Sequence, residues 1–268
     1  LAFEEFKAVK LLTSYLEKHG FAVERGLGSL QTAFRAVYQH GQGGPTIGLL
    51  CEYDALRKMG HACAHHMQGP SIIGAAIALI QLVEDVPYKI VVYGTPAEEG
   101  GGGKITMIKE GYLTDIDVAL MMHGGPATQT DVKSLASKNV VVTFHGKSSH
   151  AALRPELGRS ALDALLLTFH GVELLREHVL EDTRMHYTVT DAGGPQNVVP
   201  ARAKGTFSLR SYNSTYLKDV VRRFNLIVAG AALMTETTYE VDVAGEHESK
   251  VPVYSLNHLL MHNADRKS

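Results

Sequence analysis

Three short apolar segments most constrain the fold, because each one ends in a polar cluster. Residues 46–51, 88–95 and 117–122 are apolar enough to be buried strands, and a helix is expected at 71–83 between the first two. Short strands that alternate with helices indicate an α/β fold with a central, mostly parallel sheet. Ligands of such sheets gather at the carboxyl ends of the strands. We therefore expect a site built from the residues that follow these strands, at 52–54, 96–99 and 123–125.

The hydrophobic pattern changes after about residue 134. Four strands and two helices follow in the order β-α-β-β-α-β, at 138–145, 160–177, 185–190, 203–210, 215–234 and 238–243. This order predicts a compact α+β unit of ferredoxin-like type. We place it at residues 135–248, between a first domain at 1–134 and a return to that domain at 249–268, where a further helix begins.

Composition excludes several classes of protein. With 45% hydrophobic and 20% charged residues, the chain has the composition of a soluble globular protein. The net charge of -2 provides no basic excess for nucleic acid, and no apolar run is long enough to span a membrane. Two cysteines, Cys51 and Cys63, exclude a disulfide framework and fit a cytoplasmic location. Apolar residues at helical spacing predict a helix at 3–19, and the sequence begins at Leu1 rather than Met, so a targeting segment could precede it.

The first candidate site cluster is GHACAHH at 60–66, which contains Cys63 and His65. On a helix these two side chains would point about 200° apart, but on an extended turn both can reach one ion. Thiolate and imidazole suit zinc and similar cations. Two other interpretations stay open: a buried cysteine beside surface histidines, and a cysteine hydrolase that pairs Cys63 with His65.

The second cluster contains Glu98 and Glu99 at the end of a buried strand. Adjacent carboxylates are costly there unless a positive charge compensates them. Because successive side chains diverge, one can bind a metal while the other faces a water molecule, as a metal-assisted hydrolase requires. The plain alternative is a solvated acidic loop. His123 ends the third strand, so Cys63, His65, Glu99 and His123 would lie along one sheet edge.

The glycine run before Lys104 resembles a phosphate loop only superficially. Ile105 stands where Ser or Thr is needed, and the spacing of the glycines differs. We therefore assign no phosphate site to this segment.

GHACAH at 60–65, TPAEEGGGGK at 95–104 and HGKSSHAALRPELGRSALDA at 145–164 together resemble the M20 metallopeptidase family. The similarity is greatest to its amidohydrolase branch, which includes aminoacylases and aminobenzoyl-glutamate hydrolases. EYDAL at 52–56, followed closely by GHAC, most resembles the PM20D2-type dipeptidases. The resemblance implies a zinc-peptidase-like catalytic domain with two divalent metal ions, zinc or manganese, and an inserted lid through which the protein forms a homodimer.

The resemblance also implies roles in the catalytic domain. Cys63, as the bridging ligand, would bind the metals together with His65, Glu99 and His123. Glu98 would be the general base that takes a proton from a metal-activated water. Asp54 would orient the metal site.

In the lid, the resemblance implies three further roles. His150 matches a histidine that reaches the partner subunit's site and stabilises the tetrahedral oxyanion. Asn197 and Arg210 match positions that hold the carboxylate of the substrate.

The chain departs from the family pattern at several positions. Ala64 replaces a glycine, which is costly if its φ is positive, and His66 replaces Asn or Asp. The family also supplies a last metal-binding histidine near its C-terminus. His258 and His262 are poor candidates for that role because they lie on the returning helix. We therefore expect the second metal position to lack one ligand in the sequence as written.

The leading hypothesis is a metal-dependent hydrolase that cleaves an amide bond of N-acyl amino acids or dipeptides. The alternative is a non-catalytic, lid-bearing binding or scaffold protein whose metal site has degraded. The sequence identifies neither the acyl group nor the metal.

Overall fold

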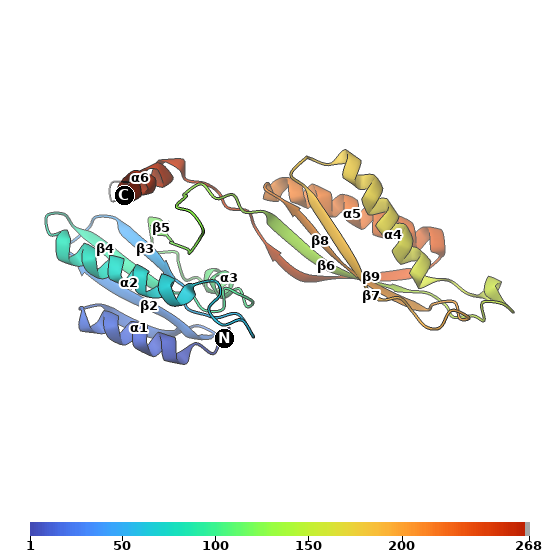
Figure 1. Cartoon of the computed structure of the whole chain (residues 1–268), viewed down its shortest axis with the longest axis horizontal. Helices are drawn as coiled ribbons and strands as arrows, with labels where there is room; N and C mark the ends of the chain where they lie inside the picture. The colour runs from blue at the N-terminus through green and yellow to red at the C-terminus, as the bar shows by residue number, and fades with distance from the viewer. Residues whose placement is uncertain (266–268) are drawn as a thin grey trace. The chain divides into compact units, whose positions relative to one another are not determined.

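The computed structural model describes residues 1–265, which form two compact units, one at residues 1–128 and one that begins at residue 129 (Figure 1). The last three residues of the predicted segment 249–268 lie outside the described residues.

The first unit is built on a five-stranded sheet with the strand order β1-β2-β4-β3-β5. Strand β4 is parallel to β3, and β3 to β5, as the alternation of apolar segments predicts. The hairpin β1–β2 adds two antiparallel strands that the sequence analysis missed. The strands are β1 Ala22–Leu27, β2 Leu30–His40, β3 Thr46–Cys51, β4 Tyr88–Gly94 and β5 Val118–Leu120.

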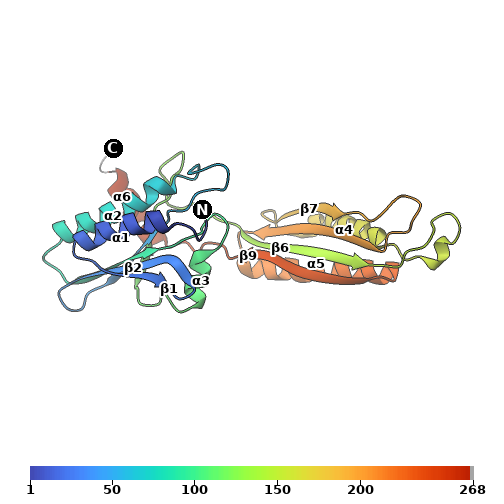
Figure 2. The same ribbon diagram turned by 90° about the horizontal axis from the view of Figure 1, so that it is seen from below.

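Helices cover both faces of this sheet (Figure 2). Helices α1 (Phe6–Lys18) and α2 (His65–Leu82) pack on one face through a shared apolar core that includes Leu16, Ile73 and Phe34. Helix α3 (Gly103–Lys109) packs on the other face, where Met107 contacts Tyr93 and its neighbours. Helix α2 begins at His65, six residues before the predicted start. The candidate metal ligand His65 is therefore the first residue of this helix.

A polar cluster anchors the second face of the sheet. Asp115 accepts hydrogen bonds from Tyr93 and Arg35 and lies 3.3 Å from Lys89 Nζ. Burial opposes ionisation of Asp115, but the three hydrogen bonds outweigh it and lower its pKa to about 2.

The second unit contains the predicted β-α-β-β-α-β arrangement. Its antiparallel sheet has the strand order β7-β8-β6-β9, which is that of a ferredoxin-like fold. All six predicted elements are present within a few residues of their expected bounds. They are β6 Ala136–His145, α4 Ala161–Leu175, β7 Arg184–Asp191, β8 Arg202–Ser211, α5 Ser214–Thr235 and β9 Thr238–His247.

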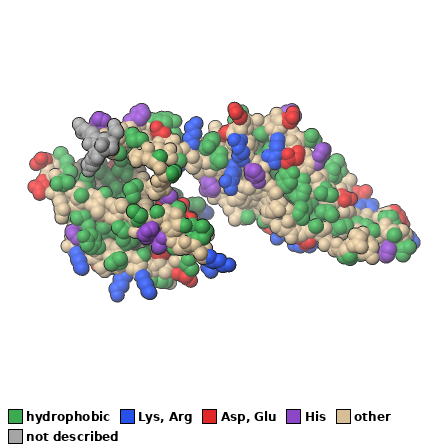
Figure 3. Space-filling model, viewed as in Figure 1, with side chains coloured by type: hydrophobic (Ala, Val, Ile, Leu, Met, Phe, Trp, Pro, Cys, Tyr) green, Lys and Arg blue, Asp and Glu red, His purple; other side chains and the backbone are tan. Residues whose placement is uncertain are grey.

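Helices α4 and α5 pack against one face of this second sheet around a core with Phe207 and Phe224 at its centre. Several large apolar side chains of the two helices remain exposed, and the space-filling view shows apolar side chains at the surface of this unit (Figure 3). They are Leu166, Leu174, Leu226, Leu233 and Met234.

Helix α6 spans Tyr254–Asp265 and contains His258 and His262, and its predicted return to the first domain stays a prediction. Among residues 1–265, none of the helices has both the length and the apolar character that crossing a bilayer requires.

Candidate metal centre

The carboxyl ends of three parallel strands supply most of the site. Strand β3 ends at Cys51 and leads into Glu52 and Asp54, β4 ends at Gly94 just before the acidic turn, and β5 ends at Leu120, three residues before His123. Because the strands are parallel and adjacent, these segments meet at one edge of the sheet. Cys63 and His65 reach the same place from the N-terminus of α2.

Two overlapping groups of candidate ligands share His65. Potential ligand atoms of Cys63, His65 and His123 lie within 4.8 Å of one another, and so do those of His65, Glu98 and Glu99. Cys63 Sγ is 3.4 Å from His123 Nε2, and the rings of His65 and His123 meet edge to face at 5.4 Å. The structure therefore brings together every residue for which a metal-binding or general-base role was predicted.

The tautomers of the two histidines follow from their neighbours. His65 Nδ1 lies 3.2 Å from both the carbonyl and the carboxylate of Asp54, so it carries the proton and donates. His123 Nδ1 lies 2.8 Å from the Gly124 carbonyl and donates likewise. Both rings therefore present the lone pair of Nε2, which is the form that binds a metal.

Asp54 connects both groups of candidate ligands. It is fully buried, and its second carboxylate oxygen accepts from the Glu99 backbone N–H at 3.0 Å. One side chain thus contacts both the His65 ring and the backbone of Glu99, and the orienting role of Asp54 stays a prediction.

Several buried polar atoms at this edge have no hydrogen-bond partner among the described residues. They are Glu52 Oε2, His65 Nε2 and Glu99 Oε1. All three are electron-rich, and buried atoms of this kind are costly unless something positive lies between them. Thiolate, imidazole and carboxylate are ligands for zinc, and imidazole and carboxylate also suit manganese. The residues present therefore fit a divalent cation site.

The environment of Cys63 disfavours the cysteine-hydrolase alternative. Burial, together with the nearby carboxylates of Glu99, Glu98 and Glu52, raises the pKa of the Cys63 thiol to about 11. Nucleophilic cysteines have a lowered pKa and positive surroundings. An anionic pocket instead favours binding of a cation, which would stabilise the thiolate.

The two departures near Cys63 have structural consequences. Ala64 has φ = 64°, so the alanine adopts the left-handed conformation that glycine adopts without strain. His66 is exposed, and its ring lies 5.0 Å from the ring of His61. Burial lowers the pKa of His61.

The turn that carries Glu98 is held from the N-terminal segment. Ala97 has φ = 56°, and its backbone N–H donates to the buried carboxylate of Glu5 at 3.0 Å. The sequence analysis missed this contact, because 92 residues separate the partners and Glu5 matches no motif.

Glu52 and Lys104 are a second feature that the sequence analysis missed. Glu52 is 1% exposed, and Lys104 forms an ion pair with its Oε1. The position of Glu52 directly after a buried strand was a usable signal. The pairing with Lys104 was not predicted, because the glycine run before Lys104 was compared only with a phosphate loop.

In the second unit, His150 and Asn197 lie in adjacent loops. The Ala151 N–H donates to the Asn197 carbonyl at 2.9 Å, and His150 pairs with Val198 in a short antiparallel bridge. His150 Nδ1 accepts from the backbone N–H groups of Ala152 and Leu153, so its exposed ring carries a proton on Nε2.

Arg210 lies near the other end of β8. It is eight residues beyond Arg202, which pairs with His145 at the end of the sheet that carries these two loops. At 3.4 Å per residue, this places Arg210 about 27 Å away from that end. Within one chain the second unit therefore does not bring Arg210 close to His150 or Asn197.

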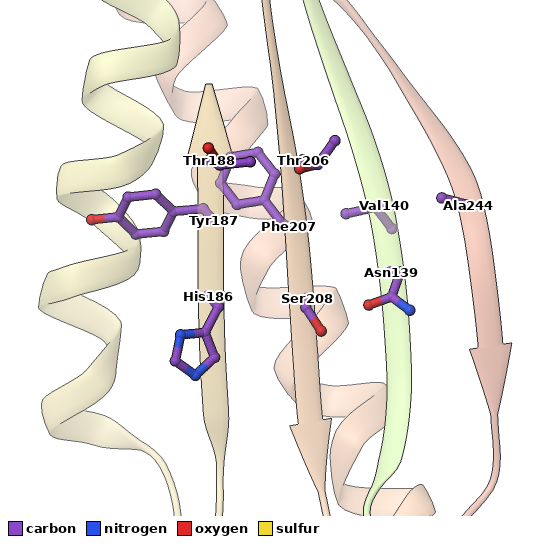
Figure 4. Close-up of a pocket in the computed structure, with 9 residues that line it drawn as sticks. All are labelled: Asn139, Val140, His186, Tyr187, Thr188, Thr206, Phe207, Ser208 and Ala244. Carbon is purple, nitrogen blue, oxygen red and sulfur yellow. The ribbon is translucent and has the colours of Figure 1, made fainter. Parts of the chain in front are cut away.

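A shallow pocket of about 330 Å³ lies on the second sheet (Figure 4). Asn139, His186, Thr206 and Ser208 line it from the face opposite the helices, whereas Phe207 belongs to the core between the sheet and the helices. It lacks a cluster of charged groups, so the sheet edge of the first unit is the better candidate site.

Comparison with known proteins places the chain in a family. The model of the peptidase dimerisation domain of the M20 family matches residues 134–234. The chain is 40% identical, over 89% of its length, to 53% of a p-aminobenzoyl-glutamate hydrolase polypeptide from Escherichia coli. It is 33% identical, over 90% of its length, to 59% of the Xaa-Arg dipeptidase of Mus musculus. The chain thus spans little more than half the length of these curated relatives.

Solved structures show the same fold. A putative aminohydrolase from methicillin-resistant Staphylococcus aureus matches 97% of the chain over 72% of its own length, with a TM-score of 0.85 at 19% identity. A Bacillus subtilis dinuclear metal-binding peptidase of the M20 family matches 99% over 75% of its own length, with a TM-score of 0.75 at 19% identity. The sequence relatives of the chain, the match to the dimerisation domain and this shared fold together show that the chain belongs to the M20 family.

Proposed function

We propose that the protein is a hydrolase that cleaves the amide bond of N-acyl amino acids or dipeptides with the help of two divalent cations. The observation that carries the proposal is the convergence of Cys63, His65, Glu99 and His123 around unpartnered buried atoms, with Glu98 beside them. The names of two relatives, a p-aminobenzoyl-glutamate hydrolase and an Xaa-Arg dipeptidase, describe cleavage of amide bonds.

Four residues would hold the cations. Cys63, whose sulfur lies near ligand atoms of both His65 and His123, would be shared between the cations, and Glu99 would supply a carboxylate. A bound divalent cation supplies Lewis acidity, which lowers the pKa of water and polarises a carbonyl group. Either zinc or manganese would occupy the site, because these ligands bind both metals.

Glu98 would be the general base. Its side chain is 39% exposed and approaches His65 Nε2 to 4.0 Å, so it borders the site without being enclosed in it. The neighbouring Glu99 is only 16% exposed and is tied to Asp54 through its backbone. Glu98 is thus free to take a proton from the attacking water and to pass it to the leaving amine.

The lid residues would act on the substrate. His150 would donate a hydrogen bond from Nε2 to the developing oxyanion in the partner subunit's site, and its tautomer supports that role. Asn197, in the adjacent loop, and Arg210 would hold the carboxylate of the substrate, and because they lie far apart within one chain they would do so from different subunits of the homodimer. A homodimer through the lid is supported by the dimerisation-domain match and by the exposed apolar side chains of α4 and α5. A cytoplasmic location belongs to the same proposal.

The substitution Glu98→Gln tests the mechanism. We expect it to leave the bound metal unchanged and to lower turnover of acyl-amino acids or dipeptides by about two to four orders of magnitude. Glu84→Gln, an exposed position in the same unit, is the matched control. Metal content by elemental analysis and kcat on a substrate panel are the measurements. Wild-type turnover in Glu98→Gln would remove Glu98 from the mechanism, and a metal-free, inactive wild-type protein would support the scaffold alternative.

A further inference from the structure

We propose that Glu52 is an additional ligand of the cation site and shares, through Oε2, the cation that His65 binds through Nε2. The inference rests on the proposed function, because it assumes that a divalent cation occupies this edge of the sheet. It gives a role to Glu52, a residue of the EYDAL motif to which the sequence analysis assigned none.

Glu52 is fixed in place from two sides. Its backbone N–H donates to Gln68 Oε1 at 2.6 Å, which ties the end of β3 to α2. Lys104 binds Oε1 of the carboxylate from the first turn of α3. The other oxygen, Oε2, is buried and has no hydrogen-bond partner among the described residues. A carboxylate that is 1% exposed thus keeps one oxygen free, and its position is fixed by two helices.

The free oxygen faces a free nitrogen. Glu52 Oε2 lies 3.3 Å from His65 Nε2, which is also buried and unpartnered among the residues described. Since Asp54 fixes the His65 proton on Nδ1, two lone-pair atoms face one another. Tetrahedral ligands about 2.0 Å from a zinc ion are separated by about 3.3 Å. The separation of the two atoms therefore suits a shared cation, as does the 3.4 Å between Cys63 Sγ and His123 Nε2.

The charge of the site supports the same conclusion. Its four carboxylates are those of Glu52, Asp54, Glu98 and Glu99, and Lys104 is the cation paired with them. With Cys63 as a thiolate, the site carries four net negative charges. Two divalent cations would neutralise this charge, to which Glu52 contributes one anion.

A protonated His65 is the competing explanation. An imidazolium ion between Asp54 and Glu52 would also place a positive charge between Nε2 and Oε2. In that case Glu52 would stabilise the fold as an ion-pair partner of His65 and Lys104, and it would not affect the affinity for cations.

The substitution Glu52→Gln separates the two explanations, because it keeps the shape and an acceptor for Lys104 but removes the anion. Zinc and manganese affinities and stoichiometries are measured by titration calorimetry on the purified protein, and thermal unfolding is recorded with and without each metal. We expect one cation to bind more than about tenfold more weakly, with a smaller metal-induced rise in Tm.

Lys104→Met is the matched control. It leaves the Glu52 carboxylate in place without its partner, so we expect cation binding to be retained and the metal-induced rise in Tm to be larger than in the wild type. If Glu52→Gln fails to fold, the double variant Glu52→Gln/Lys104→Met removes both charges together and takes its place in the titration.

Three outcomes are distinguishable. Weakened binding in Glu52→Gln, or in the double variant, with binding retained in Lys104→Met, supports the inference. Two cations bound with wild-type affinity in Glu52→Gln overturns it and leaves the proposed function intact. A wild-type protein that binds neither zinc nor manganese overturns both.

Discussion

The substitution Asp54→Asn tests whether a single buried carboxylate organises the metal site. Asp54 accepts from His65 Nδ1 at 3.2 Å through one oxygen and from the Glu99 N–H at 3.0 Å through the other. Asparagine has nearly the same shape but only one acceptor oxygen. One of the two N–H groups must therefore face the new amide N–H₂, in a place where Asp54 is 1% exposed.

The magnitude follows from the lost contact. A buried donor without a partner costs about 1–3 kcal/mol, which corresponds to a factor of about 5 to 150. If the amide oxygen turns to Glu99, the new amide N–H₂ faces the His65 Nδ1–H, which keeps only the Asp54 backbone carbonyl as an acceptor and is less firmly oriented toward the cation. If it turns to His65, the Glu99 N–H loses its partner. Both arrangements weaken cation affinity, so we expect zinc and manganese to bind about 10–100-fold more weakly.

Calorimetric titration measures the affinity, and ¹⁵N chemical shifts of the His65 ring report its tautomer. Asp115→Asn is the matched control, since it removes a carboxylate acceptor of the same unit from the cluster with Tyr93 and Arg35. It should lower stability and leave the affinity unchanged. Wild-type affinity in Asp54→Asn would refute the orienting role of Asp54.

Three further predictions concern stability. Ala64→Gly should raise the free energy of unfolding by about 0.5–1 kcal/mol in urea titrations, because it relieves a left-handed alanine at some cost in chain entropy. Phe224→Ala should remove about 3–5 kcal/mol from the second unit and leave cation affinity unchanged, since this fully buried ring packs 4.8 Å from Phe207. The pKa of Asp115 is lowered from 3.8 to about 2, so its contribution is complete above pH 3.8 and is lost as the pH falls toward 2. Acid unfolding of Asp115→Asn should lack this component, and unchanged acid unfolding would contradict the assignment.

The fold was predictable where pattern and local structure agree. The second unit was predicted element by element, because each strand and helix carries a clear period of its own. The hairpin β1–β2 was missed, although Phe34 and Ala36 are buried and Arg35 and Val37 are more exposed, because its stabilising partner is β4, which lies far along the chain. The early start of α2 was missed because Pro70 suggested a helix that begins near it.

The candidate ligands were predictable from residue type and from their position after strands. Their supporting contacts were not. Glu5 reaches Ala97 across 92 residues, and Lys104 reaches Glu52 across 52. Such partners depend on tertiary packing, which a sequence pattern alone does not report. The positive φ of Ala64 was likewise invisible in the sequence, since alanine gives no sign of a left-handed turn.

The position of each strand in the first sheet gives the two sides of the metal centre unequal rigidity. Strand β4 is hydrogen-bonded on both edges along its length, and the turn with Glu98 and Glu99 continues directly from it. His123 instead follows β5, a three-residue strand that pairs only with β3 among the strands described. Local unfolding of the short edge strand β5 costs little free energy. Displacing the turn with Glu98 and Glu99 would instead disrupt β4, which is paired on both sides. The His123 side of the centre is therefore held by fewer strand hydrogen bonds than the side that carries Glu98 and Glu99.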